Sequence, residues 1–309
     1  MRGAKVLLGT LTALGLAAQP MRLAGPLSGF VFDSGAAGIR PILGLPGAAY
    51  AGEVVASGLQ WASVAPGGAA ALAYREGALY GLSGLERLEP VWSPVESALG
   101  KPDRAAWSAD GSLAVIYSAA AGLAQLVRNP GARPAAGEPL PVGGGVTALA
   151  VDSQGRIVAG LPDGVYLFDP QAPASLLAPV QGAVAIALAG DRLWAAGAGG
   201  EIVEVEDYAG RPKAVLLASV PDPVGLAVSP DGKSLFVAGR ADRAVEIYDL
   251  ASRTTAGRLP LEVEPTTLEA LSADALWLLR ASAAGSDPLW VLKARPEPGL
   301  WFVPVGRGE

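Results

Sequence analysis

Residues 224–261 read VGLAVSPDGKSLFVAGRADRAVEIYDLASRTTAGRLPL, and this stretch decides the fold that the sequence predicts. Its apolar runs, each followed by polar residues, are 224–228, 235–238, 244–248 and 258–261. The first two runs are joined by SPDGK at 229–233, a tight-turn sequence. Proline presets φ there, aspartate accepts hydrogen bonds from the backbone, and glycine tolerates a positive φ. The stretch is therefore typical of four short antiparallel strands.

The first turn of this unit recurs along the chain at intervals of about 40 residues, a period typical of propeller blades. The recurring turns lie at 65–68, 108–112, 152–156, 189–192, 229–233 and 272–274. The runs before three of them, TALAV at 147–151, VAIAL at 184–188 and VGLAV at 224–228, alternate small and large residues. Such alternation suits the innermost strand of a blade, where space narrows toward the axis. Helical repeats are disfavoured, because the runs are short and interrupted by Gly or Pro.

A second strand pattern also recurs, as VYLFD at 165–169, IVEVE at 202–206, VEIYD at 245–249 and LWVLK at 289–293. FVFD at 30–33 matches it, so we expect the N-terminal unit to lack an inner hairpin. Residues 48–61 are the place where degenerate strands of that unit would lie. If 79–91 and 123–133 are included, the chain has six inner hairpins and seven outer ones.

We therefore predict an all-β chain, a β-propeller of four-stranded antiparallel blades. Seven blades are preferred, in a ring closed by strands from both ends of the chain, and six blades plus an N-terminal hairpin are the alternative. Seven blades of about 41 residues need roughly 290 residues, close to the length left after removal of a signal peptide.

The stretch AVSPDGKSLFVAG…AVEIYDLASRTTAGRLPL, within 226–261, resembles the YVTN-type or WD40-like bacterial β-propeller repeat. That repeat runs through an S-P-D-G turn and a V-x-V-x-D outer strand. The likeness is clear over one repeat and extends as a pattern over about 30–305, although Asp274-Ala275 replaces the usual Asp-Gly. The resemblance implies a propeller and a habit of binding other macromolecules. It implies no single activity, because propellers host many functions.

The N-terminus has the features of a secretory signal peptide. Arg2 and Lys5 precede the apolar stretch VLLGTLTALGLAA at 6–18, which ends in small residues suited to cleavage after Ala17 or Ala18. The stretch is short for a membrane span, which needs about 20 residues. We predict a signal peptide at 1–18, a single propeller domain at 26–306, and a periplasmic or extracellular location without membrane insertion after cleavage. A buried N-terminal helix is the alternative.

Composition excludes several kinds of chemistry. The chain has no Cys, which excludes disulfides, thiolate nucleophiles and a lipoprotein anchor, and no His, which excludes a Ser-His-Asp triad. Its 309 residues carry a formal charge of −6 without a basic run, so nucleic acid is a poor candidate partner. At 51% hydrophobic residues, the chain is not globally disordered.

Three sets of residues are candidates for a site, and each has a plainer interpretation that we favour. The polar groups of two predicted loops could clamp an anion near an axial opening, or could be solvated charges of the ordinary kind; they are Arg75, Glu76, Arg240, Asp242 and Arg243. The aspartates of the turns are explained by turn geometry, since no D-x-D-x-D-G run is present. The tryptophans are explained by packing between blades rather than by sugar stacking; they are Trp61, Trp92, Trp107, Trp194, Trp277, Trp290 and Trp301. Trp92, beside Pro90 and Pro94, is the hardest to assign to a core.

Three known classes of β-propeller enzyme require residues or a domain size that this chain does not have. Streptogramin-lyase-like propellers use a histidine. Lactonase-like propellers hold a divalent metal with Glu, Asp and Asn, and Asn129 is the only Asn here. Quinone-dependent dehydrogenases need a larger propeller. Catalysis by a pair of carboxylates stays open, because their separation cannot be read from sequence.

We therefore expect no catalytic, cofactor-binding or metal-binding residues. The expected function is an exported, non-catalytic propeller scaffold that binds a protein, a peptide or an envelope glycan, as a monomer. The alternative is a carboxylate- or metal-dependent hydrolase or lactonase-like enzyme that acts on a sugar or lactone. Three or more carboxylates converging at one axial opening would favour the enzyme.

Overall fold

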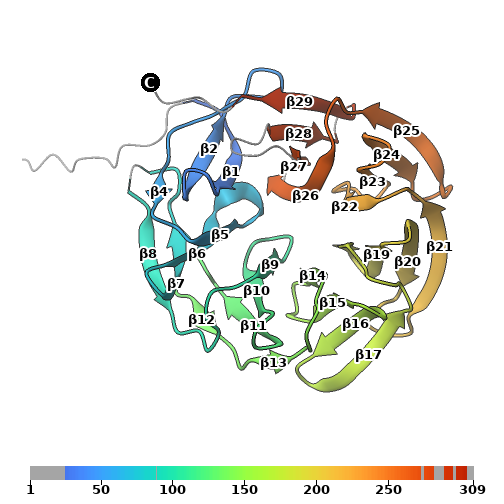
Figure 1. Cartoon of the computed structure of the whole chain (residues 1–309), viewed down its shortest axis with the longest axis horizontal. Coiled ribbons are helices and arrows are strands. Elements are labelled where there is room, and N and C mark those ends of the chain that lie inside the picture. Colours follow the sequence, from blue (N-terminus) through green and yellow to red (C-terminus); the bar gives the residue numbers. More distant parts are fainter. Residues whose placement is uncertain (1–24, 88, 273–274, 282–288, 295–296, 305–309) are drawn as a thin grey trace, which may run out of the picture.

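The chain folds into a ring of seven antiparallel sheets, a seven-bladed β-propeller (Figure 1). The computed structural model describes residues 25–87, 89–272, 275–281, 289–294 and 297–304. In these residues the one helical element is a single 3₁₀ turn, η1 (Pro66–Gly68). No helix within the described ranges is long and apolar enough to cross a membrane. The predicted all-β propeller with seven blades is confirmed, and six blades plus a hairpin is wrong.

The first three blades use consecutive strands from the N-terminal half of the chain, with these bounds. Blade 1 contains β1 (Leu27–Asp33), β2 (Gly38–Leu43), β3 (Tyr50–Ala51) and β4 (Ala56–Ser57). Blade 2 contains β5 (Trp61–Val64), β6 (Ala70–Arg75), β7 (Ala78–Ser83) and β8 (Val91–Val95). Blade 3 contains β9 (Arg104–Trp107), β10 (Leu113–Ser118), β11 (Leu123–Arg128), β12 (Ala135–Ala136) and β13 (Leu140–Pro141).

The other four blades each contain four consecutive strands. Blade 4 contains β14 (Ala148–Val151), β15 (Ile157–Leu161), β16 (Gly164–Asp169) and β17 (Ala172–Ala178). Blade 5 contains β18 (Ala185–Ala189), β19 (Arg192–Ala196), β20 (Glu201–Glu206) and β21 (Lys213–Ser219). Blade 6 contains β22 (Pro223–Val228), β23 (Ser234–Gly239), β24 (Ala244–Asp249) and β25 (Thr254–Pro260). Blade 7 contains β26 (Pro265–Ser272), β27 (Leu276–Ala281), β28 (Leu289–Lys293) and β29 (Gly299–Val303).

Blade 1 corrects the expectation that the N-terminal unit lacks its inner hairpin. Its first strand, β1, lies against β5 and β26, the innermost strands of the two neighbouring blades, so β1 and β2 form the inner hairpin. What blade 1 lacks is a separate outermost row, because β3 and β4 both pair with β2. Residues 48–61, where degenerate strands of a missing inner hairpin were expected, instead hold β3 and β4, the short strands that pair with the outer side of β2. FVFD at 30–33 resembles an outer strand because both end in an aspartate. Asp33 accepts a hydrogen bond from the amide of Ala36, just as Asp249 at the end of an outer strand accepts one from the amide of Ala251. That pattern identifies a turn and not the row of its strand.

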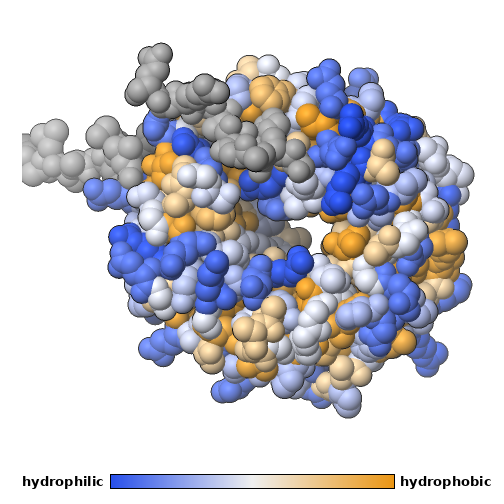
Figure 2. Space-filling model, in the orientation of Figure 1, coloured by the Kyte–Doolittle hydropathy of each residue, from blue (hydrophilic) through white to orange (hydrophobic). Residues whose placement is uncertain are grey.

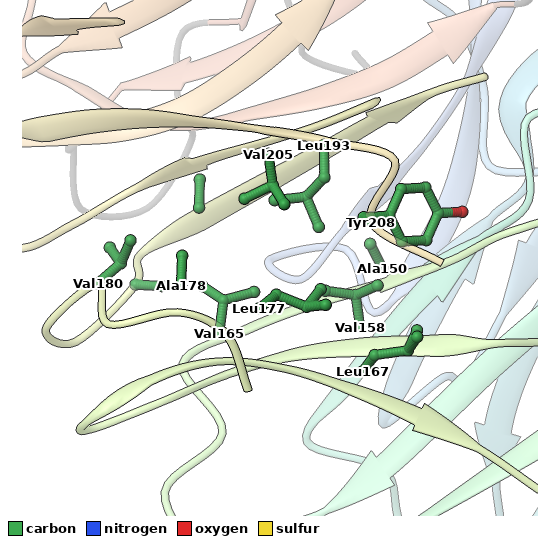
Figure 3. Packing of buried hydrophobic residues seen from close by; sticks show 12 residues of the cluster. Ala150, Val158, Val165, Leu167, Leu177, Ala178, Val180, Leu193, Val205 and Tyr208 are labelled. Carbon is green, nitrogen blue, oxygen red and sulfur yellow. The ribbon is translucent and has the colours of Figure 1, made fainter. Parts of the chain in front are cut away.

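Seven apolar cores, one between each pair of adjacent blades, hold the ring together. Because side chains alternate across a strand, each middle strand supplies two cores. On β23, Leu235 and Val237 pack toward blade 5, whereas Phe236 packs toward blade 7. Figure 3 shows the core between blades 4 and 5, where Val158 faces Leu193 among other side chains of the two sheets. Coverage on both sides explains the continuous apolar runs in the sequence.

The ring closes by packing between blades 1 and 7. Val31 and Ile42 of blade 1 share a core with Leu278 of blade 7. The amide of Ala51 also donates a hydrogen bond to the carbonyl of Pro304, at 3.0 Å. In the described part of the chain, no sheet combines strands from both ends, so the expected closure by strand exchange is wrong.

The strand order gives the ring two distinct faces. We call the face that carries the connections between blades, together with the turns from second to third strands, the crossover face. The turns from first to second and from third to fourth strands lie on the opposite face, the hairpin face. The space-filling view shows a narrow opening near the middle of the ring (Figure 2).

A shallow pocket on blade 2

A pocket on blade 2 brings together members of two candidate sets, the charged pair Arg75–Glu76 and the tryptophan Trp92. It is lined by Arg75, Glu76, Tyr80 and Trp92, and its volume is about 190 Å³. Arg75 ends β6, Glu76 lies in the turn before β7, Tyr80 lies on β7, and Trp92 lies on the outer strand β8. The turn that holds Glu76 lies on the crossover face, between the second and third strands of the blade, and Trp92 lies near the start of β8, toward the hairpin face. The pocket therefore follows the outer half of the blade, away from its innermost strand β5. The expected position of Arg75 and Glu76 at an axial opening is therefore wrong.

The pocket residues contact one another in a chain. The guanidinium carbon of Arg75 lies 5.6 Å from the centre of the Trp92 ring, a cation–π distance. The ring of Tyr80 meets that of Trp92 edge to face, with centroids 5.6 Å apart. Nε of Arg75 donates a 3.2 Å hydrogen bond to Oε1 of Glu76. The four side chains thus form an aromatic wall with one cation and one anion at its rim.

Backbone conformation places Glu76 beside the guanidinium. Glu76 has a φ of +52°, uncommon for a residue with a side chain, and Gly77 follows with +84°. These two left-handed residues make the two-residue turn between β6 and β7. Both charged side chains remain well exposed, Arg75 at 42% and Glu76 at 76%. Their ion pair therefore adds little stability and leaves both groups able to bind a ligand.

The truncated edge of blade 1 leaves this side of blade 2 open. Tyr80 and Trp92 lie on the side of blade 2 that faces blade 1, next to the core containing Ala56 and Leu59. Elsewhere in the ring, an outermost strand such as β17 packs against the outer strands of the following blade. Among the described residues, blade 1 has no strand in that row, and the aromatic rings keep an accessible surface.

The second predicted set of charges forms ordinary pairs on blade 6. Arg240 lies 3.5 Å from Asp222, and Arg243 lies 2.8 Å from Glu264. The backbone carbonyl of Asp242 accepts a hydrogen bond from Arg258. These side chains are about half exposed and do not converge with Arg75 and Glu76, because they lie three blades away around the ring. Their interpretation as solvated loop charges agrees with these contacts.

The aspartates in the turns between first and second strands stabilise these turns through local hydrogen bonds. Asp110 accepts hydrogen bonds from the hydroxyls of Ser108 and Ser112, and these bonds hold its pKa below the ordinary value. The hydroxyl of Ser229 donates to Asp231 in the same way. Asp274, the corresponding residue of blade 7, lies outside the described residues. Across the described ranges, no group of three or more His, Cys, Asp or Glu side chains is placed to hold a metal ion.

Most tryptophans pack between blades, as predicted. Trp194 and Trp277 are buried in such cores. Three others are partly buried against cores: Trp61, Trp107 and Trp290. Trp92 also borders a core but turns one side to the pocket. Tyr80 was not singled out from the sequence. The signal that could have identified Tyr80 is its spacing. It lies on β7 two residues before Leu82, and Leu82 pairs with Trp92 on β8.

Two charged networks on the hairpin face contain residues that are not among the candidates from the sequence. Glu204, fully buried in β20, is paired with Arg192 and lies 3.0 Å from Arg253 of blade 6. The hydroxyl of Tyr208 donates a 2.9 Å hydrogen bond to Asp152 of blade 4. Burial and this hydrogen bond raise the pKa of Tyr208 to about 12. A glutamate inside the apolar run IVEVE was the sequence signal for the first network. Both networks join adjacent blades and have a buried residue at their centre, Glu204 in one and Tyr208 in the other, so they are structural.

No known protein-family model matches the chain, and no curated protein matches it either. The seven-bladed architecture is consistent with a WD40-like repeat protein.

Proposed function

We propose that the protein is an exported, non-catalytic β-propeller scaffold that binds a partner at the cell envelope, as a monomer. We further propose that its repeats are of the YVTN type and bacterial. The pocket on blade 2 is the observation that supports binding most directly. It combines exposed aromatic surface with an arginine and a glutamate whose ion pair is too exposed to contribute much to folding. Tryptophan, tyrosine and arginine, three of the four residues of the pocket, are enriched at recognition surfaces.

A capture experiment tests the binding role. The purified full chain is immobilised and incubated with envelope extract, and captured proteins and glycans are identified with and without competition by free protein. A partner displaced by the wild type, but not by the Trp92→Ala variant, supports the proposal. If neither proteins nor glycans are retained above a blank support, the binding role is wrong.

The export part is tested separately. Residues 1–24 are fused to a reporter enzyme that is active only outside the cytoplasm, with Leu8→Arg as a control that interrupts the apolar stretch. Reporter activity that depends on Leu8 supports export, and an inactive fusion contradicts it.

A further inference from the structure

The charges of the pocket narrow the chemistry of its ligand. Arg75 already covers part of the Trp92 ring, so a cationic ligand would meet a like charge there. An anionic ligand would meet the carboxylate of Glu76, which lies within hydrogen-bond distance of the same guanidinium. A neutral group that both donates and accepts hydrogen bonds satisfies both residues at once. Hydroxyl groups have this property, because they donate to a carboxylate and accept from a guanidinium.

The size of the pocket limits what can enter it. Pockets for drug-sized ligands have volumes of roughly 300–1,000 Å³, whereas this one measures about 190 Å³. One ring-sized group fills it. Because the described part of blade 1 has no outermost row beside the pocket, we expect a longer ligand to continue along the rim.

The aromatic wall selects the shape of that group. Trp92 presents ring surface beside the edge-on Tyr80, and an aromatic face carries negative charge density that attracts C–H groups. A pyranose ring has an apolar C–H face and hydroxyl groups around its edge. It therefore matches an aromatic wall with a donor and an acceptor at the rim.

We propose that the pocket binds one neutral pyranose ring of a longer glycan, with its C–H face on Trp92 and neighbouring hydroxyls on Arg75 and Glu76. This proposal rests on the binding role above and names its ligand class. For one ring in an open pocket, the dissociation constant is on the order of 1 mM.

The test uses the purified full chain and defined oligosaccharides in titration calorimetry and ligand-detected NMR. Maltohexaose, cellohexaose and the fully N-acetylated chitin hexamer are the neutral probes, hexagalacturonate is the anionic probe, and the deacetylated chitosan hexamer is the cationic one. We expect at least one neutral probe to bind saturably and both charged probes to bind at least fivefold more weakly. Binding of charged probes alone, or of no probe, overturns the proposal.

Variants locate the binding. Trp92→Ala should abolish it, and Arg75→Gln and Glu76→Gln should each weaken it at least fivefold. Both of these latter side chains are exposed, so their loss leaves the melting temperature unchanged and keeps the test valid if Trp92→Ala fails to fold. The matched control is Phe302→Ala, which removes the exposed member of the aromatic pair Trp290–Phe302 on the outer strands of blade 7. The arginine–glutamate pair that the structure describes on this blade, Arg280–Glu269, lies on the inner strands β26 and β27. Binding that survives all three pocket variants overturns the proposal.

The outcomes separate this proposal from the broader one. If a protein partner is captured in a Trp92-dependent manner while no neutral oligosaccharide binds, the scaffold role stands and the sugar assignment falls. If the capture experiment and every oligosaccharide titration fail together, both fall.

Discussion

Individual charged residues of this protein contribute very differently to the stability of the fold, depending on how deeply they are buried. Glu204 is fully buried and is paired with Arg192, whose guanidinium also lies 5.1 Å from the ring centre of Trp194. Glu206, two residues further on, is 39% exposed and pairs with Arg253 at 2.6 Å. The attraction between charges is weak in water and strong where water is excluded, but burial also removes hydration. A buried carboxylate therefore needs its partner, and an exposed one does not.

Removing Arg192 should consequently destabilise the fold. We expect Arg192→Ala to lower the free energy of unfolding by about 2–3 kcal/mol, because it leaves Glu204 buried with a weaker counter-charge. Glu206→Ala, the control at the exposed end of the same network, should change it by less than about 0.5 kcal/mol. Urea denaturation followed by tryptophan fluorescence measures both values. If the two substitutions lower the free energy of unfolding equally, burial does not make the Arg192–Glu204 pair more important than the exposed pair.

Tyr208 predicts a stability change at high pH. Its pKa rises from 10.0 to about 12 on folding, through burial and the hydrogen bond to Asp152. Above pH 10 the unfolded chain loses this proton while the folded chain keeps it, so the contribution is complete below pH 10 and is lost by about pH 12. The stability difference between wild type and Tyr208→Phe should therefore shrink across this window, by roughly 2 kcal/mol at most. Denaturation at pH 9, 10.5 and 12 measures it, and a constant difference argues against the assignment.

At the scale of strands, the sheets are shaped by close approach as much as by hydrogen bonds. Gly81 in β7 lies so near blade 3 that an added Cβ would stand 1.9 Å from the carbonyl oxygen of Pro130. Gly232, in the turn between β22 and β23, has a φ of +67° but open space around it. The first glycine is required by packing between blades, and the second only by the conformation of its turn.

Alanine at these two glycines should separate the two effects. Gly81→Ala is expected to cost about 3 kcal/mol, since a backbone carbonyl cannot rotate away as a side chain does. Gly232→Ala is expected to cost about 1–2 kcal/mol, the usual penalty for a left-handed alanine. Thermal and urea unfolding of the two variants test the order. The reverse order would contradict the close approach of blades 2 and 3.

For the whole molecule, the notable property is that closure depends on ordinary packing. Blades 7 and 1 meet through a core like the other six, reinforced by the hydrogen bond from Ala51 to Pro304. The outer rim of the ring is not uniformly polar: Figure 2 shows apolar residues at the rim over β21, where Leu216 is 66% exposed. The seven cores together, rather than any one covalent link, keep the ring closed.

If the closing core is equivalent to the others, a cavity in it should cost as much as one elsewhere. Leu278→Ala lies in the core between blades 7 and 1, and Leu193→Ala lies in the core between blades 4 and 5. Both leucines are at most 2% exposed, so each change should cost about 3 kcal/mol. A clearly smaller cost at Leu278, measured by denaturation, would indicate a ring that opens between its ends.

The sequence by itself determined the repeat and the architecture. Short apolar runs separated by turns such as SPDG at 229–232 specify strands and hairpins locally, and their period specifies blades. It also identified the turn role of Asp110 and the packing role of most tryptophans, since both depend on near neighbours in the chain. What only the tertiary structure decided was the row that each strand occupies. FVFD at 30–33 has the same alternation in an inner or an outer row, because both rows are covered on two sides. The pocket depends on that choice: Arg75 and Trp92 meet in an open pocket where blade 1 lacks an outermost row, and such an absence leaves no local pattern in the sequence.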